Sequence, residues 1–171
     1  MPDRPSPQVL STNERVMLFT MLDWYRDGVV AKVGGLSDDA AWACPTGSAT
    51  SIAGLVNHLA LVEDSWFTER FAGGANQEPW ASAPWDVDPD WEFGQARREP
   101  LAASVERYRT AVERSRTIQV AAELDQMAAR PSGRGDRFTL RWAVVHLLEE
   151  TARHLGHLDI LRELADGVTG E

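Results

Sequence analysis

Residues 139–165 read TLRWAVVHLLEETARHLGHLDILRELA. Apolar residues recur in this stretch at every third or fourth position, which is the period of an α-helix that buries one face. Gly167 follows the stretch and is typical of a helix end. We therefore expect a long amphipathic helix over about 139–165, and its partners should be sought among the other periodic stretches.

Three further stretches show helical periodicity, over about 12–33, 51–73 and 91–117. The first begins with a capping-box pattern, in which Ser11 is the expected N-cap and the side chain of Glu14 reaches back to it. Four long helices joined by short or medium loops predict an all-α protein, an antiparallel four-helix bundle.

The segments between these helices complete the expected organisation. Residues 74–90 form a long connection between the second and third helices, rich in proline, aspartate and tryptophan. Loops of this length are often functional or mobile; we expect packing, with a lid over the site as the alternative. Pro100 predicts a kink or a broken start in the third helix. Residues 118–129 read as a short helix or ordered loop, residues 1–11 as a disordered tail, and 12–167 as one domain.

The composition and charge of the chain argue against several classes of function. The 171 residues carry a net charge of −9, so binding through nucleic-acid phosphates is not expected. No apolar run approaches the roughly 20 residues that span a bilayer, and the first residues have no apolar signal-peptide core. Cys44 is the single cysteine, which rules out an internal disulfide, and we interpret it as an ordinary loop residue. A cytoplasmic protein that meets neither membrane nor nucleic acid is expected.

Four ionisable side chains share one stripe of the last helix. His146, Glu150, His154 and His157 follow one another at spacings of four, four and three, which places them on one face. Apolar residues flank the stripe, and burying such groups without partners is costly. A bound metal would supply a partner. The alternative is a solvent-facing stripe whose pairs contribute only a few tenths of a kcal/mol each.

The distribution of histidines favours the metal interpretation. His58 is the only histidine outside the last helix, and it lies in the middle of the second periodic stretch. Together with Glu150 and His154 it would supply two imidazole nitrogens and one carboxylate. Three protein ligands leave a coordination position open, as in catalytic sites. Zinc, iron and nickel all accept such ligands.

Two stretches carry a resemblance to a known family. Residues 55–67 (LVNHLALVEDSWF) resemble the second helix of the DinB-like superfamily, and residues 141–163 (RWAVVHLLEETARHLGHLDILRE) resemble its last helix. The nearest branch is the one linked to mycothiol-dependent enzymes such as maleylpyruvate isomerase. The resemblance covers about 12–167, most of the chain.

The resemblance implies an up-down-down-up four-helix bundle, frequent homodimers, and a metal held by three side chains. Carried over position by position, the metal ligands are His58, Glu150 and His154. Many relatives have histidine where this chain has Glu150. His157 stands where many relatives have glutamine, and we interpret it as a catalytic acid or base near the metal. His146 is interpreted as a structural residue or as one that supports a ligand.

Three functions remain open at this point. The first is a divalent-metal-dependent S-transferase or isomerase that uses a low-molecular-weight thiol, with mycothiol as candidate co-substrate, a small-molecule substrate, and zinc expected before nickel or iron. A bound metal stabilises a thiolate. The second is a hydrolase with a metal-activated water, for which His157 is a better base than Glu149. The third is a non-catalytic bundle that binds a metal or small molecule.

Overall fold

The structure is a computed structural model that describes residues 13–169. Its elements in chain order are α1 (Glu14–Val33), α2 (Asp38–Trp42), α3 (Ile52–Glu63), the π-helix η1 (Asp64–Phe71), the 3-10 helix η2 (Trp80–Ser82), α4 (Trp91–Ala96), α5 (Leu101–Ala121) and α6 (Leu140–Asp166). Over residues 13–169 the only β-pairing is an isolated bridge between Met127 and Thr139. The expected all-α class is confirmed.

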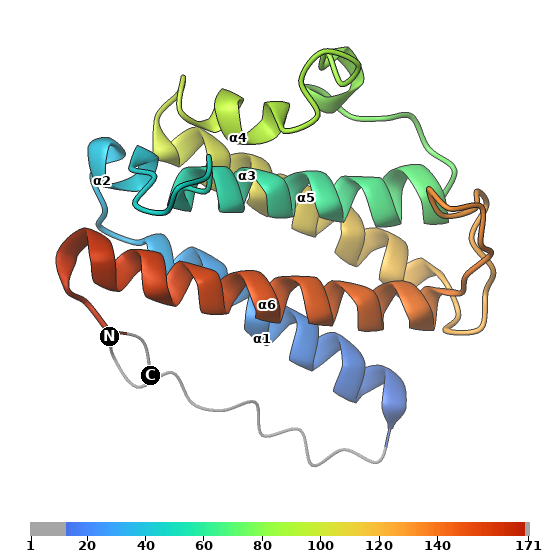
Figure 1. The fold of residues 1–171 in the computed structure, drawn as a ribbon. Helices are drawn as coiled ribbons and strands as arrows, with labels where there is room; N and C mark the ends of the chain where they lie inside the picture. Colours follow the sequence, from blue (N-terminus) through green and yellow to red (C-terminus); the bar gives the residue numbers. More distant parts are fainter. Residues whose placement is uncertain (1–12, 170–171) are drawn as a thin grey trace.

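The packing of the long helices follows a simple order (Figure 1). α6 packs along α1 on one side and along α3 on the other, and α3 in turn packs against α5. The buried apolar side chains form two clusters. One cluster centres on Leu55, Leu59 and Leu158 and the other on Leu22 and Leu147. α1, α3 and α6 contribute to both clusters. Because α6 packs against both α1 and α3, and α3 against both α6 and α5, α3 and α6 are the two inner helices of this order.

The start of α1 differs from the expected one. Asn13 is its N-cap, and the Asn13 side-chain oxygen accepts a hydrogen bond from the backbone N–H of Val16 at 3.1 Å. The expected N-cap, Ser11, lies outside the described residues. Asparagine caps a helix as well as serine does, and α1 begins directly after Asn13.

The expected third helix is two helices. α4 ends at Ala96 and α5 begins at Leu101, directly after Pro100. The prediction of one helix over 91–117 was therefore wrong, and the break at Pro100 is confirmed. The backbone N–H of Leu101 donates to Asp38 Oδ1 at 2.8 Å, which fixes the first turn of α5 against α2. α5 continues to Ala121, so residues 118–121 belong to it, and the segment after them is loop.

The second expected helix is confirmed as a continuous helical segment, although its last part is a π-helix. Ser51 caps α3 by accepting the N–H of Gly54 at 3.1 Å. Gly54 also allows α4 to approach closely, since a Cβ atom there would lie 2.6 Å from Cδ1 of Phe93. The glycine thus permits the close contact between α3 and α4.

The tryptophan-rich connection packs onto the core. Trp80 is fully buried, and its indole N–H donates to Asp64 Oδ2 at 3.1 Å. The Trp85 indole N–H donates to the Trp80 carbonyl at 3.0 Å. The ring of Trp91 meets those of Trp80 and Trp85 edge to face. These contacts confirm packing for the tryptophans of this segment.

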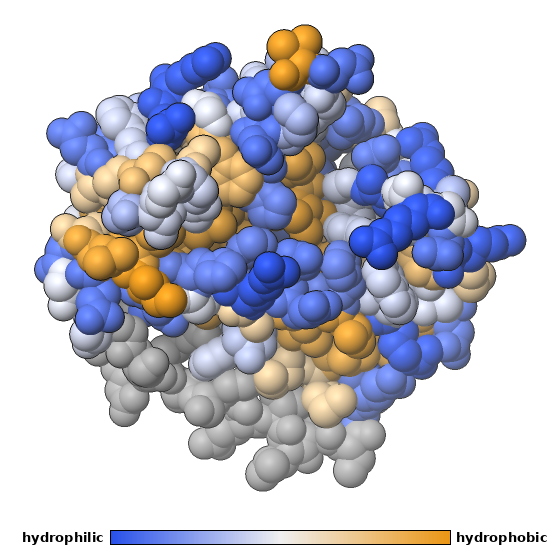
Figure 2. Space-filling view, in the orientation of Figure 1, coloured by the Kyte–Doolittle hydropathy of each residue, from blue (hydrophilic) through white to orange (hydrophobic). Residues whose placement is uncertain are grey.

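On the face shown in Figure 2, hydrophilic side chains predominate and apolar surface appears in patches between them. Within residues 13–169, no helix combines the length and the apolar character that crossing a bilayer requires.

A buried ion pair joins α1 to α3. Nε and Nη2 of Arg26 each donate to a Glu63 carboxylate oxygen at 2.7 Å, and both side chains are 1% exposed. Burial lowers the pKa of Arg26, but Glu63 more than offsets this and leaves the pKa raised. Arg26 is therefore charged, and its buried guanidinium depends on the Glu63 carboxylate as its partner.

Removing one member of this pair should destabilise the protein strongly. We expect Glu63→Leu to lower the free energy of unfolding by about 3–5 kcal/mol, because it leaves Arg26 buried without a counter-charge. The double variant Arg26→Met/Glu63→Leu should recover most of the loss. Urea denaturation measures both, and equal stability of the single and double variants would contradict this account.

Candidate functional site

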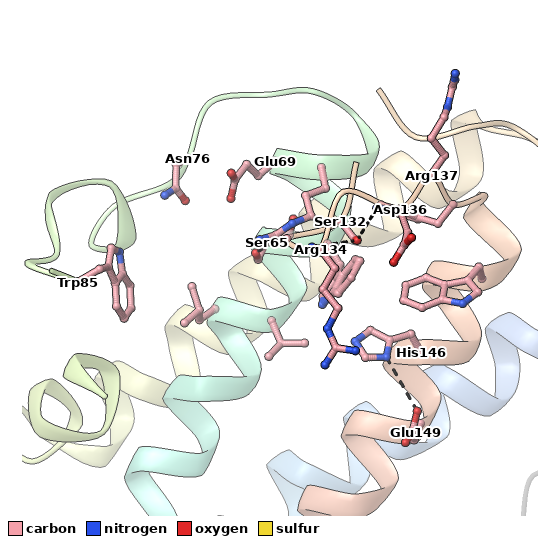
Figure 3. A pocket seen from close by; sticks show the side chains of 17 residues that line it. Ser65, Glu69, Asn76, Trp85, Ser132, Arg134, Asp136, Arg137, His146 and Glu149 are labelled. Carbon is pink, nitrogen blue, oxygen red and sulfur yellow. Dashed lines mark hydrogen bonds and ion pairs between the residues drawn. The ribbon is translucent and has the colours of Figure 1, made fainter. Parts of the chain in front are cut away.

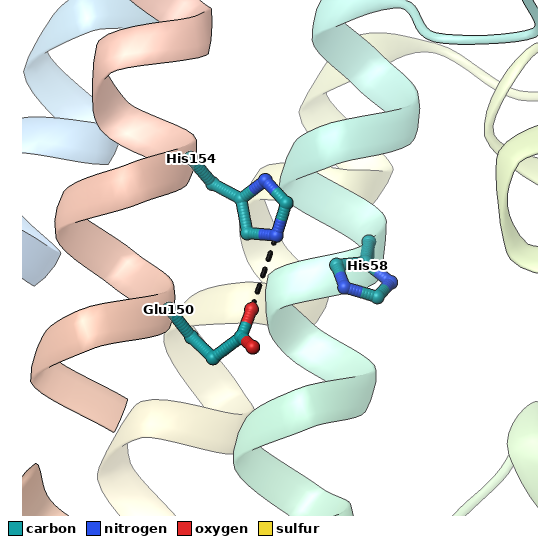
Figure 4. Close-up of side chains that lie close together, drawn as sticks. All are labelled: His58, Glu150 and His154. Atoms are coloured by element: carbon teal, nitrogen blue, oxygen red, sulfur yellow. Dashed lines mark ion pairs between the residues drawn. The ribbon is translucent and has the colours of Figure 1, made fainter. Parts of the chain in front are cut away.

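The candidate site lies between α3 and α6. His58 is on α3, and Glu150 and His154 lie four residues apart on α6. One potential ligand atom from each side chain lies within 4.8 Å of the other two. The structure therefore brings together the three residues that the sequence singled out as metal ligands (Figure 4).

The three side chains converge with defined geometry. His154 Nε2 lies 3.2 Å from Glu150 Oε2, as the i and i+4 positions of a helix allow. The rings of His58 and His154 meet edge to face, with centroids 5.1 Å apart. Figure 4 shows one ring nitrogen of His58 directed toward the other two side chains and the second nitrogen directed away. Two imidazole nitrogens and a carboxylate thus face a common point.

His154 is held in its neutral form. Burial and the neighbouring His58 lower the pKa of His154 from 6.5 to about 4, and Glu150 only partly opposes this. Its imidazole is therefore uncharged at neutral pH, which is the form that binds metals. The site is ready for a cation without first losing a proton from His154.

Glu92, a residue that the sequence did not single out, orients His58. Its Oε1 lies 3.0 Å from His58 Nδ1, and it is 5% exposed. Because Nδ1 contacts this carboxylate, Nε2 is the nitrogen of His58 that faces Glu150 and His154 (Figure 4). The neighbouring Phe93 stacks on the His58 ring with centroids 5.5 Å apart. Two neighbouring residues of α4, Glu92 and Phe93, therefore hold the ring of His58 in place.

A polar network fixes α4 in this place. The Asn57 side-chain amide donates to the Glu92 carbonyl at 2.7 Å, and Arg107 Nη1 donates to Asn57 Oδ1 at 2.5 Å. Arg107 also pairs with Glu99 at 2.6 Å. Asn57 is fully buried, so its contacts are not replaceable by water. No pattern in the sequence predicts the role of Glu92, because its contact with His58 joins two separate helices.

His157 lies on the far side of His154. Its Nδ1 is 3.3 Å from Nδ1 of His154, whereas Nε2 of His154 faces Glu150. His157 is exposed to solvent. It therefore contacts a member of the triad without being part of it.

The remaining candidates lie outside the triad. His146 packs against the rings of Trp66 and Trp142, with centroids 4.6 and 4.9 Å away, and these two rings also contact each other. Its Nδ1 lies 3.9 Å from the exposed Glu149. Cys44 is a partly buried loop residue whose Sγ contacts the carbonyl of Trp42, and no described contact links it to the triad.

A cavity of about 1090 Å³ begins one turn of helix away from the triad, and Figure 3 shows the side chains that line it. It lies between the α3–η1 segment and the first half of α6, and the loops on either side border it. Leu61 and His146 line it, each one turn of helix from a triad residue. The arrangement provides a ligand-sized space close to a group of side chains that could hold a metal ion.

The structure thus defines the class of protein: it has an all-helical fold with a His–Glu–His group between two of its helices. The model of the Mycothiol-S-transferase family matches residues 17–167, and the chain belongs to this family. The resemblance to the mycothiol-linked branch of DinB-like proteins is confirmed. Membership implies a low-molecular-weight thiol as partner. No curated protein matches the chain.

The lowered pKa of His154 should make stability depend on pH. Its pKa is about 4 in the folded protein and near 6.5 in the unfolded chain, so the unfolded chain binds more protons between these values. The free energy of unfolding is therefore highest above about pH 6.5. It falls as the pH is lowered toward 4, by up to about 3 kcal/mol.

Urea denaturation in the presence of a chelator, at pH 7 and pH 5, measures this loss. The variant His154→Gln removes the titrating group and should show a smaller drop between the two values. An identical drop in both proteins would contradict the pKa assignment.

Proposed function

We propose that this protein is a divalent-metal-dependent mycothiol S-transferase. The observation that carries the proposal is the convergence of His58, Glu150 and His154 within 4.8 Å beside a cavity. Family membership supports the thiol as one substrate. The second substrate is proposed to be a small electrophile.

The donor set fits a metal of the zinc class. It consists of two imidazoles and one carboxylate, and the lowered pKa of His154 keeps one imidazole neutral. Three protein ligands leave a position for the sulfur of the thiol. We propose zinc first and nickel or iron as alternatives, since all three accept nitrogen and oxygen ligands.

A bound metal would supply positive charge that favours the thiolate over the thiol. In the transfer, the S–H proton is lost, the sulfur bonds to the electrophilic carbon, and the leaving group departs with the electrons of its bond. We propose that His157 takes up the proton, because it is exposed, can exchange protons with solvent, and contacts His154.

Glu92 is proposed to act through His58. A histidine ligand commonly donates its second N–H to a carboxylate, which fixes the ring orientation and tautomer. The pair of the partly buried His58 and the buried Glu92 has this geometry.

Two further features belong to the proposal. We propose that α1, α3, α5 and α6 form the up-down-down-up four-helix bundle that the resemblance implies, supported by the packing order α1–α6–α3–α5. The contacts of Glu14 with Arg141 and of Lys32 with Arg162 show that α1 and α6 run parallel, so the neighbouring helices are not all antiparallel. A homodimer is proposed on the basis of the resemblance alone, and sedimentation at several concentrations tests it.

Removal of a ligand should remove the metal. We expect His154→Ala and His58→Ala each to lose most bound zinc, because each variant deletes one of three protein ligands. His146→Ala is the matched control, since His146 lies on the same face of α6 outside the triad. Elemental analysis with a circular dichroism check of folding measures this. Full zinc occupancy in folded His154→Ala would disprove the ligand assignment.

Loss of the Glu92 carboxylate should weaken metal binding without abolishing it. We expect Glu92→Gln to lower zinc affinity by about 10–100-fold, the usual effect of removing a residue that orients a ligand. Glu149→Gln removes an exposed carboxylate near the same site and should leave affinity unchanged. Zinc titration against a competing chelator compares them, and equal affinities of Glu92→Gln and wild type would refute the positioning role.

The proposed reaction is tested by incubating the zinc-loaded protein with mycothiol and an activated aryl chloride. Product that requires thiol, metal and protein together is the expected result. His157→Gln should keep its zinc and lose about 100-fold or more in turnover if it handles the proton. Product formed without thiol would indicate the hydrolase instead, and zinc binding without turnover would indicate a binding protein.

A further inference from the structure

We propose that the cavity beside the triad binds the electrophilic substrate, and that this substrate is a flat, aromatic or conjugated molecule that carries a carboxylate or similar anion. The inference rests on the proposed function, since it assigns the second substrate of that reaction. It depends on three features of the cavity: its position, its aromatic wall and an unpaired arginine.

The cavity continues the face on which the triad lies. His146 precedes Glu150 by one turn of α6, and Leu61 follows His58 by one turn of α3. Both residues line the cavity. A molecule held there extends away from the triad along the groove between the two helices and presents one end to the triad, where the thiol sulfur would be held.

One wall of the cavity is a cluster of flat rings. The Trp142 and His146 rings stack at an interplanar angle of 19°, and Trp66 meets both. Trp142 is 46% exposed although it is a large apolar residue. Exposed aromatic surface within a cavity is typical of a binding site for an apolar or planar group.

An arginine without a partner extends into the same cavity. Arg134 lies in the turn before α6, and Figure 3 shows its guanidinium reaching toward His146. Within residues 13–169, no carboxylate or carbonyl pairs with this side chain. Arg70, by contrast, donates to the Ser65 carbonyl at 3.2 Å and lies over the Trp66 ring. Arg134 is therefore the guanidinium that is free to bind a carboxylate.

The remaining charges border the cavity without neutralising Arg134. Glu149 pairs with His146 at 3.9 Å, Glu69 lies on η1 and Asp136 lies in the turn with Arg134. Arg137 points away from the cavity in Figure 3. The total charge of the lining is thus nearly balanced. Arg70 and Arg134 both bring positive charge near the rings, but Arg70 already contacts Ser65 and Trp66, whereas no described group pairs with the Arg134 side chain. A substrate that binds Arg134 would therefore carry its anionic group next to the flat part that packs against the rings.

Two isosteric aryl chlorides test the proposal: 4-chloro-3-nitrobenzoate and the uncharged 4-chloro-3-nitrobenzamide. In both, the sulfur bonds to the ring carbon and chloride departs with the electrons of the C–Cl bond. We expect Arg134→Gln to raise KM for the benzoate about tenfold, with kcat little changed, because it removes one charge-assisted contact. The KM values for the benzamide and for mycothiol should stay the same.

Arg137→Gln is the matched control, because it removes an arginine of the same turn that points away from the cavity. It should leave all three KM values unchanged. Trp142→Leu should weaken both aryl chlorides, since it removes part of the ring wall. An equal effect of Arg134→Gln on the benzoate and the benzamide, or an effect on mycothiol alone, would overturn the proposal.

Binding without reaction separates this inference from the proposed function. Calorimetric titration of the zinc-loaded protein with 4-chloro-3-nitrobenzoate, in the absence of thiol, should show binding that Arg134→Gln weakens about tenfold. If this holds and no S-transfer occurs, the proposed function fails while the anion-binding cavity stands. If the benzoate does not bind to wild type, or binds equally to Arg134→Gln, the proposed ligand class is wrong.

Discussion

The antiparallel packing of α3 against α6 is the constraint on which the site depends. Residue numbers rise along α3 as they fall along α6, so His58 meets His154 while Trp66, further along, meets His146. Apolar side chains from both helices fill the two core clusters and set this register. A shift of one turn would separate His58 from Glu150 and His154. The same hydrophobic burial that stabilises the fold therefore also positions the polar site.

α3 and the first residue of η1 carry polar side chains that would be costly to bury alone, and other helices supply their partners. Glu63 pairs with Arg26 of α1, Asp64 accepts from Arg114 of α5, and Asn57 contacts α4. Each partner restricts where its own helix lies relative to α3, because buried charges and amides require their partners. α3 is thus held on several sides, which limits the movement of His58. The orientation of His58 therefore depends on all of these contacts together.

The sequence was sufficient for the parts of the structure that depend on local periodicity. The long C-terminal helix and the shared face of Glu150 and His154 follow from spacing within one helix, and both are present. The meeting of His58 with this pair depends on contacts between helices, which spacing cannot establish. The distribution of histidines suggested it, and the family resemblance assigned the same three residues. Pro100 gave the correct position of the helix break, although the separate α4 was not foreseen.

Other features could not be read from the chain because they arise only when distant segments meet. Glu92 reaches His58 across two helices, and no spacing rule relates positions that far apart. The aromatic wall combines Trp66 with Trp142 in the same way. The N-cap of α1 was missed for another reason. Ser11 and Asn13 have similar capping preferences, so local propensity did not predict which of them caps the helix.

The most direct test of the account is a crystal structure of the zinc-loaded protein with anomalous scattering recorded at the zinc edge. The account predicts one strong anomalous peak between α3 and α6, bound by one nitrogen each of His58 and His154 and by Glu150, at about 2.0–2.2 Å. Glu92 should then be seen on the other nitrogen of His58. A zinc-loaded crystal with no peak at this position, or with the peak on other side chains, would contradict the central claim.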